Sequence, residues 1–89
     1  MKDNTKNQKI IVYGAMWCPD TLRALHFFTE NNIEVDFKDI DSNEENTKFV
    51  EESNNGMRII PTIILPNGSL LVEPSNSELE RALTRLNIQ

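Results

Sequence analysis

Short apolar runs and longer helical repeats alternate along the first half of the chain. Lys9–Tyr13 is a β-branched run of the kind that forms a buried strand. Pro19 suits the first position of a helix, because an N–H group there would have no helical partner. This helix should end near Asn31–Asn32, and Glu34–Ile40 then alternates apolar and polar positions, which predicts a second strand. The apolar positions of the helix recur at helical spacing, at Leu22, Leu25 and Phe28.

The middle of the chain carries a second helical signal and a second apolar run. Capping oxygens at Asp41–Asn43 precede a predicted helix over Glu44–Asn54, which Asn55–Gly56 should end. Met57–Leu65 is strongly apolar and indicates a third strand, although Pro61 lies in its midst.

A hairpin and a last helix complete the pattern. Asn-Gly within Pro66–Ser69 is a strong turn signal, and Leu70–Val72 is its returning strand. Pro74–Asn76 begins the last helix, for which either Ser75 or Ser77 can serve as the N-cap. One face of that helix is apolar, with Leu79, Ala82, Leu83 and Leu86.

The predicted order of elements is β-α-β-α-β-β-α, which is an α/β protein. The first β-α-β unit should be a right-handed crossover with two parallel strands, and the final hairpin is antiparallel. We therefore expect a four-stranded mixed sheet flanked by three helices. The folded domain should cover 9–89, and the polar residues 1–8 should form a flexible tail.

Composition narrows the classes of protein that this chain can belong to. Its 89 residues are enough for one small domain, and no apolar run approaches a membrane span. A net charge of −5 argues against nucleic acid and anionic membranes as partners. A single cysteine makes no internal disulfide, so we expect a reducing cytoplasm as its compartment. We also expect the protein to be a monomer. One cysteine and one histidine, His26, do not make a zinc site, and His26 is expected on a helix surface.

Cys18 is the candidate reactive group. It lies at the junction between the first predicted strand and the first predicted helix, beside unpaired N–H groups and the positive end of the helix dipole. These features favour the thiolate, which is the reactive form of cysteine. The position that would complete a Cys-x-x-Cys pair holds Thr21, so the chemistry must use one thiol.

Four motifs, in this order and spacing, resemble the thioredoxin fold and more narrowly a glutaredoxin of the mycoredoxin-like branch. They are Trp17-Cys18-Pro19, Ile60-Pro61-Thr62, Asn67-Gly68-Ser69 and Glu73-Pro74-Ser75-Asn76. The resemblance runs from about Lys9 to Leu86. It implies that Pro61 is cis and packs against Cys18, and that the backbone of Ile60 pairs with a substrate peptide or a thiol tripeptide.

The chain departs from the dithiol members of that family at several positions. They carry a second cysteine at Thr21, often a tyrosine at Asp20, and a lysine at Ala15 that holds a glutathione carboxylate. Arg58 is our candidate to replace that lysine, because its guanidinium suits a carboxylate. Ser75 and Asn76 stand where a glycine pair usually precedes the last helix, and they are further candidate thiol contacts. No tightly bound cofactor is expected, and the co-substrate is glutathione or another low-molecular-weight thiol.

The resemblance implies a monothiol glutaredoxin-type oxidoreductase, with redox homeostasis and electron transfer as its role. Cys18 would be catalytic, and its partners would be small thiols and protein mixed disulfides. We expect the Thr21 hydroxyl to hydrogen-bond the thiolate and the Asp20 carboxylate to oppose it. The supporting residues around the thiol would be Trp17, Pro19, Asp20, Thr21 and Pro61.

Three alternatives stay open at the level of sequence. Cys18 can ligate a [2Fe–2S] cluster shared between two subunits, with small thiols as the other ligands. The chain can instead be a redox-inactive interaction module that keeps the fold. Thr21 can also be an engineered replacement of a native cysteine.

Overall fold

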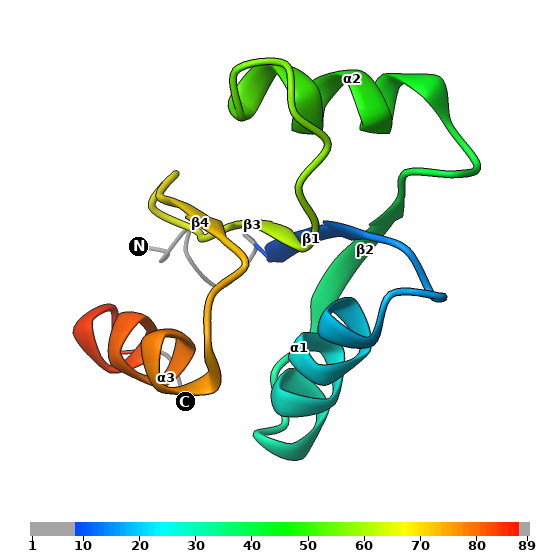
Figure 1. The fold of residues 1–89 in the computed structure, drawn as a ribbon. Helices are drawn as coiled ribbons and strands as arrows, with labels where there is room; N and C mark the ends of the chain where they lie inside the picture. The colour runs from blue at the N-terminus through cyan, green and yellow to red at the C-terminus, as the bar shows by residue number, and fades with distance from the viewer. Residues whose placement is uncertain (1–8, 88–89) are drawn as a thin grey trace.

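Four strands form one mixed sheet in the order β2-β1-β3-β4 (Figure 1). The structure is a computed structural model that describes residues 9–87. The expected tail at 1–8 and the last two residues of the expected domain, 88–89, lie outside the described residues. The strands are β1 (Ile10–Gly14), β2 (Val35–Asp39), β3 (Thr62–Ile64) and β4 (Leu70–Val72).

The register of the sheet places β1 at its centre. Val12 lies opposite Phe37 of the parallel strand β2 and opposite Ile63 of the antiparallel strand β3. Ile63 in turn lies opposite Leu71 in the antiparallel β3–β4 hairpin. The parallel first pair and the antiparallel hairpin confirm the α/β class and the mixed sheet predicted from the sequence. Within the described residues, no helix is long and apolar enough to cross a membrane.

Three helices cover the two faces of this sheet. They are α1 (Pro19–Glu30), α2 (Glu44–Ser53) and α3 (Asn76–Arg85). Figure 1 shows α1 and α3 on one face and α2 alone on the other. The larger core lies on the two-helix face and comprises Ile10, Val12, Ala24, Phe28, Ile63, Leu65, Leu79 and Leu83. The smaller core comprises Ala15, Ile40, Val50 and Ile60.

Local capping signals explain where two of the helices begin. The Asn43 side chain accepts a hydrogen bond from the Glu45 N–H at 2.8 Å and so caps α2. Ser75 and Glu78 form a reciprocal capping box at the start of α3. The structure therefore selects Ser75 over Ser77 as the N-cap.

Two expectations from the apolar pattern were wrong in detail. The run Met57–Leu65 forms a strand only at Thr62–Ile64. Pro61 has no N–H for a ladder, and the segment before it places Ile60 in the smaller core without pairing. On α1, Leu22 is 41% exposed although its spacing suggested a core position. The buried position in that turn belongs to its neighbour Thr21.

Candidate functional site

Cys18 is the N-cap residue of α1. Its backbone is extended (φ −92°, ψ 115°), its N–H donates to the Ala15 carbonyl at 3.0 Å, and its carbonyl accepts from the Leu22 N–H at 3.1 Å. Its side chain makes no capping hydrogen bond, in contrast to the N-cap side chains of the other two helices. The half-buried thiol, which is in no disulfide, is therefore available for chemistry beside the free N–H groups of the helix start.

Thr21 supports the site by packing and leaves the thiol unbonded. Its side chain is fully buried, and its Oγ1 lies 3.4 Å from the Ala15 N–H, which donates to it. A Cβ at Gly14 would come within 2.5 Å of the same oxygen. The expected hydrogen bond from Thr21 to Cys18 is not formed in the structure, because the side chain is turned toward the end of β1.

The residues before β3 contribute to the core on which Cys18 packs. Cys18 packs against the smaller core, of which Ile60 is a member, and Pro61 is fully buried. The Ile60–Pro61 peptide bond is cis, as the resemblance implied. The structure thus places Cys18 at the same small core as Ile60, which is more than 40 residues away in the sequence.

Trp17 is held at the surface beside Cys18. Its side chain is 67% exposed, and the indole N–H donates to the Asp41 carboxylate. This hydrogen bond joins the loop before α1 to the loop between β2 and α2. Met16 is also exposed, so two large apolar side chains of the loop before Cys18 lie at the surface.

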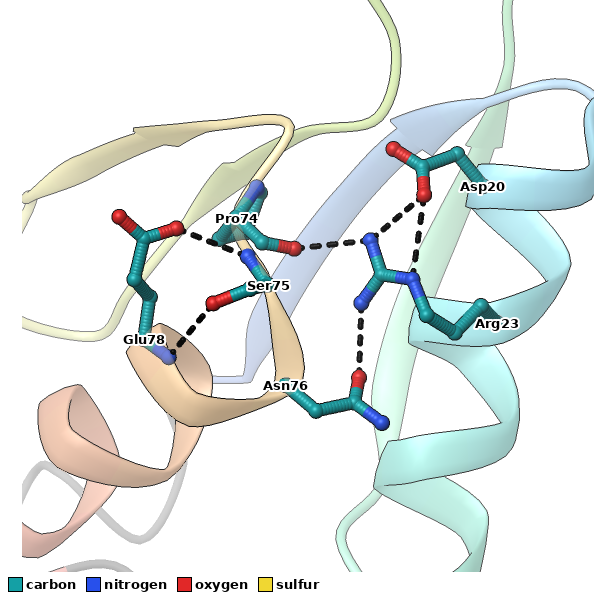
Figure 2. A network of polar contacts seen from close by, with 6 residues as sticks. All are labelled: Asp20, Arg23, Pro74, Ser75, Asn76 and Glu78. Atoms are coloured by element: carbon teal, nitrogen blue, oxygen red, sulfur yellow. Dashed lines mark hydrogen bonds and ion pairs between the residues drawn. The ribbon is translucent and has the colours of Figure 1, made fainter.

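Asp20 belongs to a polar network that links α1 to the start of α3 (Figure 2). Arg23 donates to Asp20 Oδ1 through Nε at 3.1 Å and through Nη2 at 2.8 Å. The same guanidinium donates to the Pro74 carbonyl at 2.8 Å and to Asn76 Oδ1 at 2.7 Å. The Asp20 carboxylate, expected to oppose the thiolate, is therefore paired with a cation.

Ser75 and Asn76 are both engaged in internal hydrogen bonds. Ser75 Oγ accepts from the Glu78 N–H at 3.1 Å, and the Ser75 N–H donates to Glu78 Oε1 at 2.8 Å. Asn76 Oδ1 accepts from Arg23. Their role as thiol contacts remains a prediction, and a ligand there would have to share or displace these partners.

Arg58 and His26 both lie on the surface. Arg58 pairs with Glu51 at 3.7 Å, and its side chain is 57% exposed. His26 pairs with Glu30 at 3.0 Å one turn along α1, where it is exposed as expected. Within 9–87 no three His, Cys, Asp or Glu side chains are grouped so that they could hold a metal ion.

Sequence reasoning missed Arg23 and Asp41. The spacing of Asp20 and Arg23 by three residues is a recognised helix pair and was an available signal. The contacts of Arg23 with Pro74 and Asn76 span 51 and 53 residues, and that of Trp17 with Asp41 spans 24. No local sequence pattern predicts contacts between residues so far apart in the sequence.

The family model and the similar sequences agree on the family to which this chain is related. A family model described as thioredoxin matches residues 1–80. A Mycobacterium tuberculosis protein named as a glutaredoxin is 34% identical over 77 residues, which cover 86% of this chain and 92% of the relative. Mycoredoxin 1 of Corynebacterium glutamicum is 30% identical over 70 residues, which cover 79% of this chain and 86% of the relative.

Comparison with solved structures supports the same fold. A glutaredoxin from Archaeoglobus fulgidus superposes with a TM-score of 0.68 at 19% identity. The match covers 91% of this chain and 92% of that one. The strand order, the helix N-cap cysteine and the cis proline thus occur in a chain whose whole architecture matches a known fold.

Proposed function

Because this chain belongs to the glutaredoxin-like, mycoredoxin-related part of the thioredoxin superfamily, we propose that it is a monothiol thiol–disulfide oxidoreductase. Its substrates would be mixed disulfides between a protein and a small thiol. The observation that carries this proposal is the placement of Cys18 at the N-cap of α1, with its thiol outside any capping bond and packed against the smaller core.

The first step would be attack of the Cys18 thiolate on the small-thiol sulfur of the mixed disulfide. The protein–small-thiol S–S bond breaks, and a new S–S bond forms between Cys18 and the small thiol. The protein sulfur leaves as a thiolate and takes a proton from solvent. The unpaired N–H groups at the start of α1 favour the anionic form of the attacking sulfur.

The second step would regenerate the thiol with another small-thiol molecule. Its thiolate attacks the small-thiol sulfur attached to Cys18, which releases the Cys18 thiolate and the disulfide of two small thiols. The net reaction converts the mixed disulfide and one free small thiol into a reduced protein cysteine and the disulfide of two small thiols, so one small thiol is oxidised for each protein cysteine that is reduced. Since the chain has one cysteine, it has no internal thiol to release a bound protein substrate.

The substrate thiol is proposed to be glutathione or another low-molecular-weight thiol with a carboxylate. The exposed Arg58 supports this choice, because its ion pair with Glu51 is long and solvent-screened and a ligand carboxylate can compete for it. The backbone of Ile60, a residue of the core on which Cys18 packs, would pair with the peptide part of the thiol.

Turnover of a glutathionylated test disulfide tests the proposal directly. The assay compares wild type with Cys18→Ser, each with glutathione and with other small thiols as reductant. We expect turnover by wild type with at least one thiol and none by Cys18→Ser. Absence of turnover with every thiol, or equal rates for the two proteins, would reject the proposal.

A further inference from the structure

Arg23 is the most fully engaged charged side chain near the site. Its four hydrogen bonds to Asp20, Pro74 and Asn76 use nearly all of its N–H donors (Figure 2). Two of these bonds converge on one oxygen of Asp20, in the first turn of α1. The other two reach the segment that leads into α3.

Asp20 is the acidic residue in the first turn of the helix that Cys18 caps. The two residues are two apart in sequence, so their Cα atoms are at most about 7.6 Å apart. The Asp20 charge therefore belongs to the same helix start that favours the Cys18 thiolate. A carboxylate without a partner at this place would disfavour a second negative charge on the Cys18 sulfur.

Arg23 is held in position from the α3 side. The Pro74 carbonyl and Asn76 Oδ1 accept its N–H groups at 2.8 and 2.7 Å, and Pro74 is buried. The guanidinium is therefore fixed beside Asp20 by contacts that do not depend on Asp20. The pair is partly exposed, with side-chain exposures of 32% for Arg23 and 41% for Asp20, so solvent weakens the attraction between the two charges. The hydrogen bonds to Pro74 and Asn76 therefore help to hold the Arg23 guanidinium beside Asp20.

We infer that Arg23 is a positioning residue for the thiol chemistry: it compensates the Asp20 charge beside Cys18 and ties the first turn of α1 to the start of α3. The inference rests on the proposed function, since compensation matters only where Cys18 reacts as a thiolate. It also assigns Asn76 to the support of Arg23, whether or not Asn76 contacts a small thiol.

The test measures the rate at which iodoacetamide alkylates Cys18 at neutral pH and low ionic strength. This reagent is uncharged, so removal of an arginine does not change its attraction to the protein. Arg23→Met should alkylate more slowly than wild type by roughly twofold to fivefold, the size of effect expected for one charge near a helix start. Asp20→Asn should be faster than wild type, because it leaves the Arg23 cation unopposed.

The double variant Arg23→Met/Asp20→Asn separates charge compensation from a purely structural role. We expect its rate to return to near the wild-type value, whereas a purely structural role leaves it as slow as Arg23→Met. Arg23→Lys keeps the charge without the forked geometry, and its rate should lie between wild type and Arg23→Met. High salt, with a screening length of about 3 Å at 1 M, should also restore the rate of Arg23→Met.

Arg81→Met is the matched control, because Arg81 is an exposed α3 arginine with no ion pair among residues 9–87. Its alkylation rate should equal wild type. Circular dichroism and urea titration establish that each variant is folded, and if Arg23→Met does not fold, Asp20→Asn alone decides the question. An Arg23→Met rate equal to wild type, a double variant as slow as Arg23→Met, or an Asp20→Asn rate at or below wild type would overturn the inference.

This test is separate from the test of the proposed function, because alkylation needs no disulfide substrate. A wild-type protein that turns over mixed disulfides while the variants alkylate alike would reject only the role of Arg23. A wild-type protein without turnover would reject the proposed function whatever the alkylation rates.

Discussion

Thr21 packs directly against the α-carbon of Gly14. A Cβ built at Gly14 would lie 2.5 Å from Thr21 Oγ1 and 2.6 Å from Thr21 Cγ2, and both residues are buried. The last residue of β1 and the first turn of α1 can approach this closely only because position 14 has no side chain. The orientation of the first turn of α1 against the sheet depends on this contact.

Gly14→Ala should therefore destabilise the protein by about 1–3 kcal/mol, the usual cost of overpacking a tight site. Urea unfolding followed by circular dichroism measures the change. Thr21→Ala removes both atoms that clash, so the double variant Gly14→Ala/Thr21→Ala should recover part of the loss. A Gly14→Ala protein as stable as wild type would show that the contact is easily relieved.

Thr21→Cys should allow an internal disulfide with Cys18. The two residues are the N-cap and the third residue of α1, a spacing of three at which side chains of a helix start come near each other, and a cysteine at position 21 can rotate about χ1 away from Gly14. After mild oxidation, mass spectrometry should find the monomer lighter by two hydrogens, with no free thiol. The variant Cys18→Ser/Thr21→Cys should keep one free thiol, and two free thiols in oxidised Thr21→Cys would contradict the prediction.

Ser75→Ala should cost about 1 kcal/mol of stability, because it removes the N-cap oxygen that accepts from the Glu78 N–H. Ser77→Ala is the matched control. Ser77 is an exposed residue within α3, so its substitution should change stability by less than about 0.5 kcal/mol. Equal effects of the two substitutions in urea titrations would be inconsistent with the capping box.

Asp41→Ala should increase the motion of the Trp17 indole, because it removes the acceptor of the indole N–H. Trp17 is the only tryptophan of the chain, so its fluorescence anisotropy reports on this loop alone. We expect a lower anisotropy than in wild type. Asp36→Ala makes the same change of charge on β2 and should leave the anisotropy unchanged; a similar decrease in both variants would argue against the tether.

Periodicity and local capping chemistry were sufficient to predict most of the fold. The β-branched run at Lys9–Tyr13, the proline at position 19 and the Asn-Gly turn each act over a few residues, and the structure confirms the elements that they predict. The prediction of a strand over the whole apolar run Met57–Leu65 was wrong, because the first half of the run contributes to the hydrophobic core without hydrogen bonding to a neighbouring strand. Apolar residues are typical both of buried loops and of strands, so the composition of a segment does not distinguish the two.

The candidate site also has features that the sequence predicts and features that only the folded structure shows. The sequence by itself determined that Cys18 lies at a strand–helix junction, that its helix begins at Pro19, and that no second cysteine stands beside it. Only the tertiary structure decided that Thr21 turns toward Gly14, that Cys18 packs on the core to which Ile60 belongs, and that Arg23 pairs with Asp20 while reaching Pro74 and Asn76. Hydrogen bonds and packing within one turn join residues that are close in the sequence, so the spacing of residue types can predict them. Contacts across 50 residues depend on which faces the folded sheet brings together, and that is a property of the whole chain.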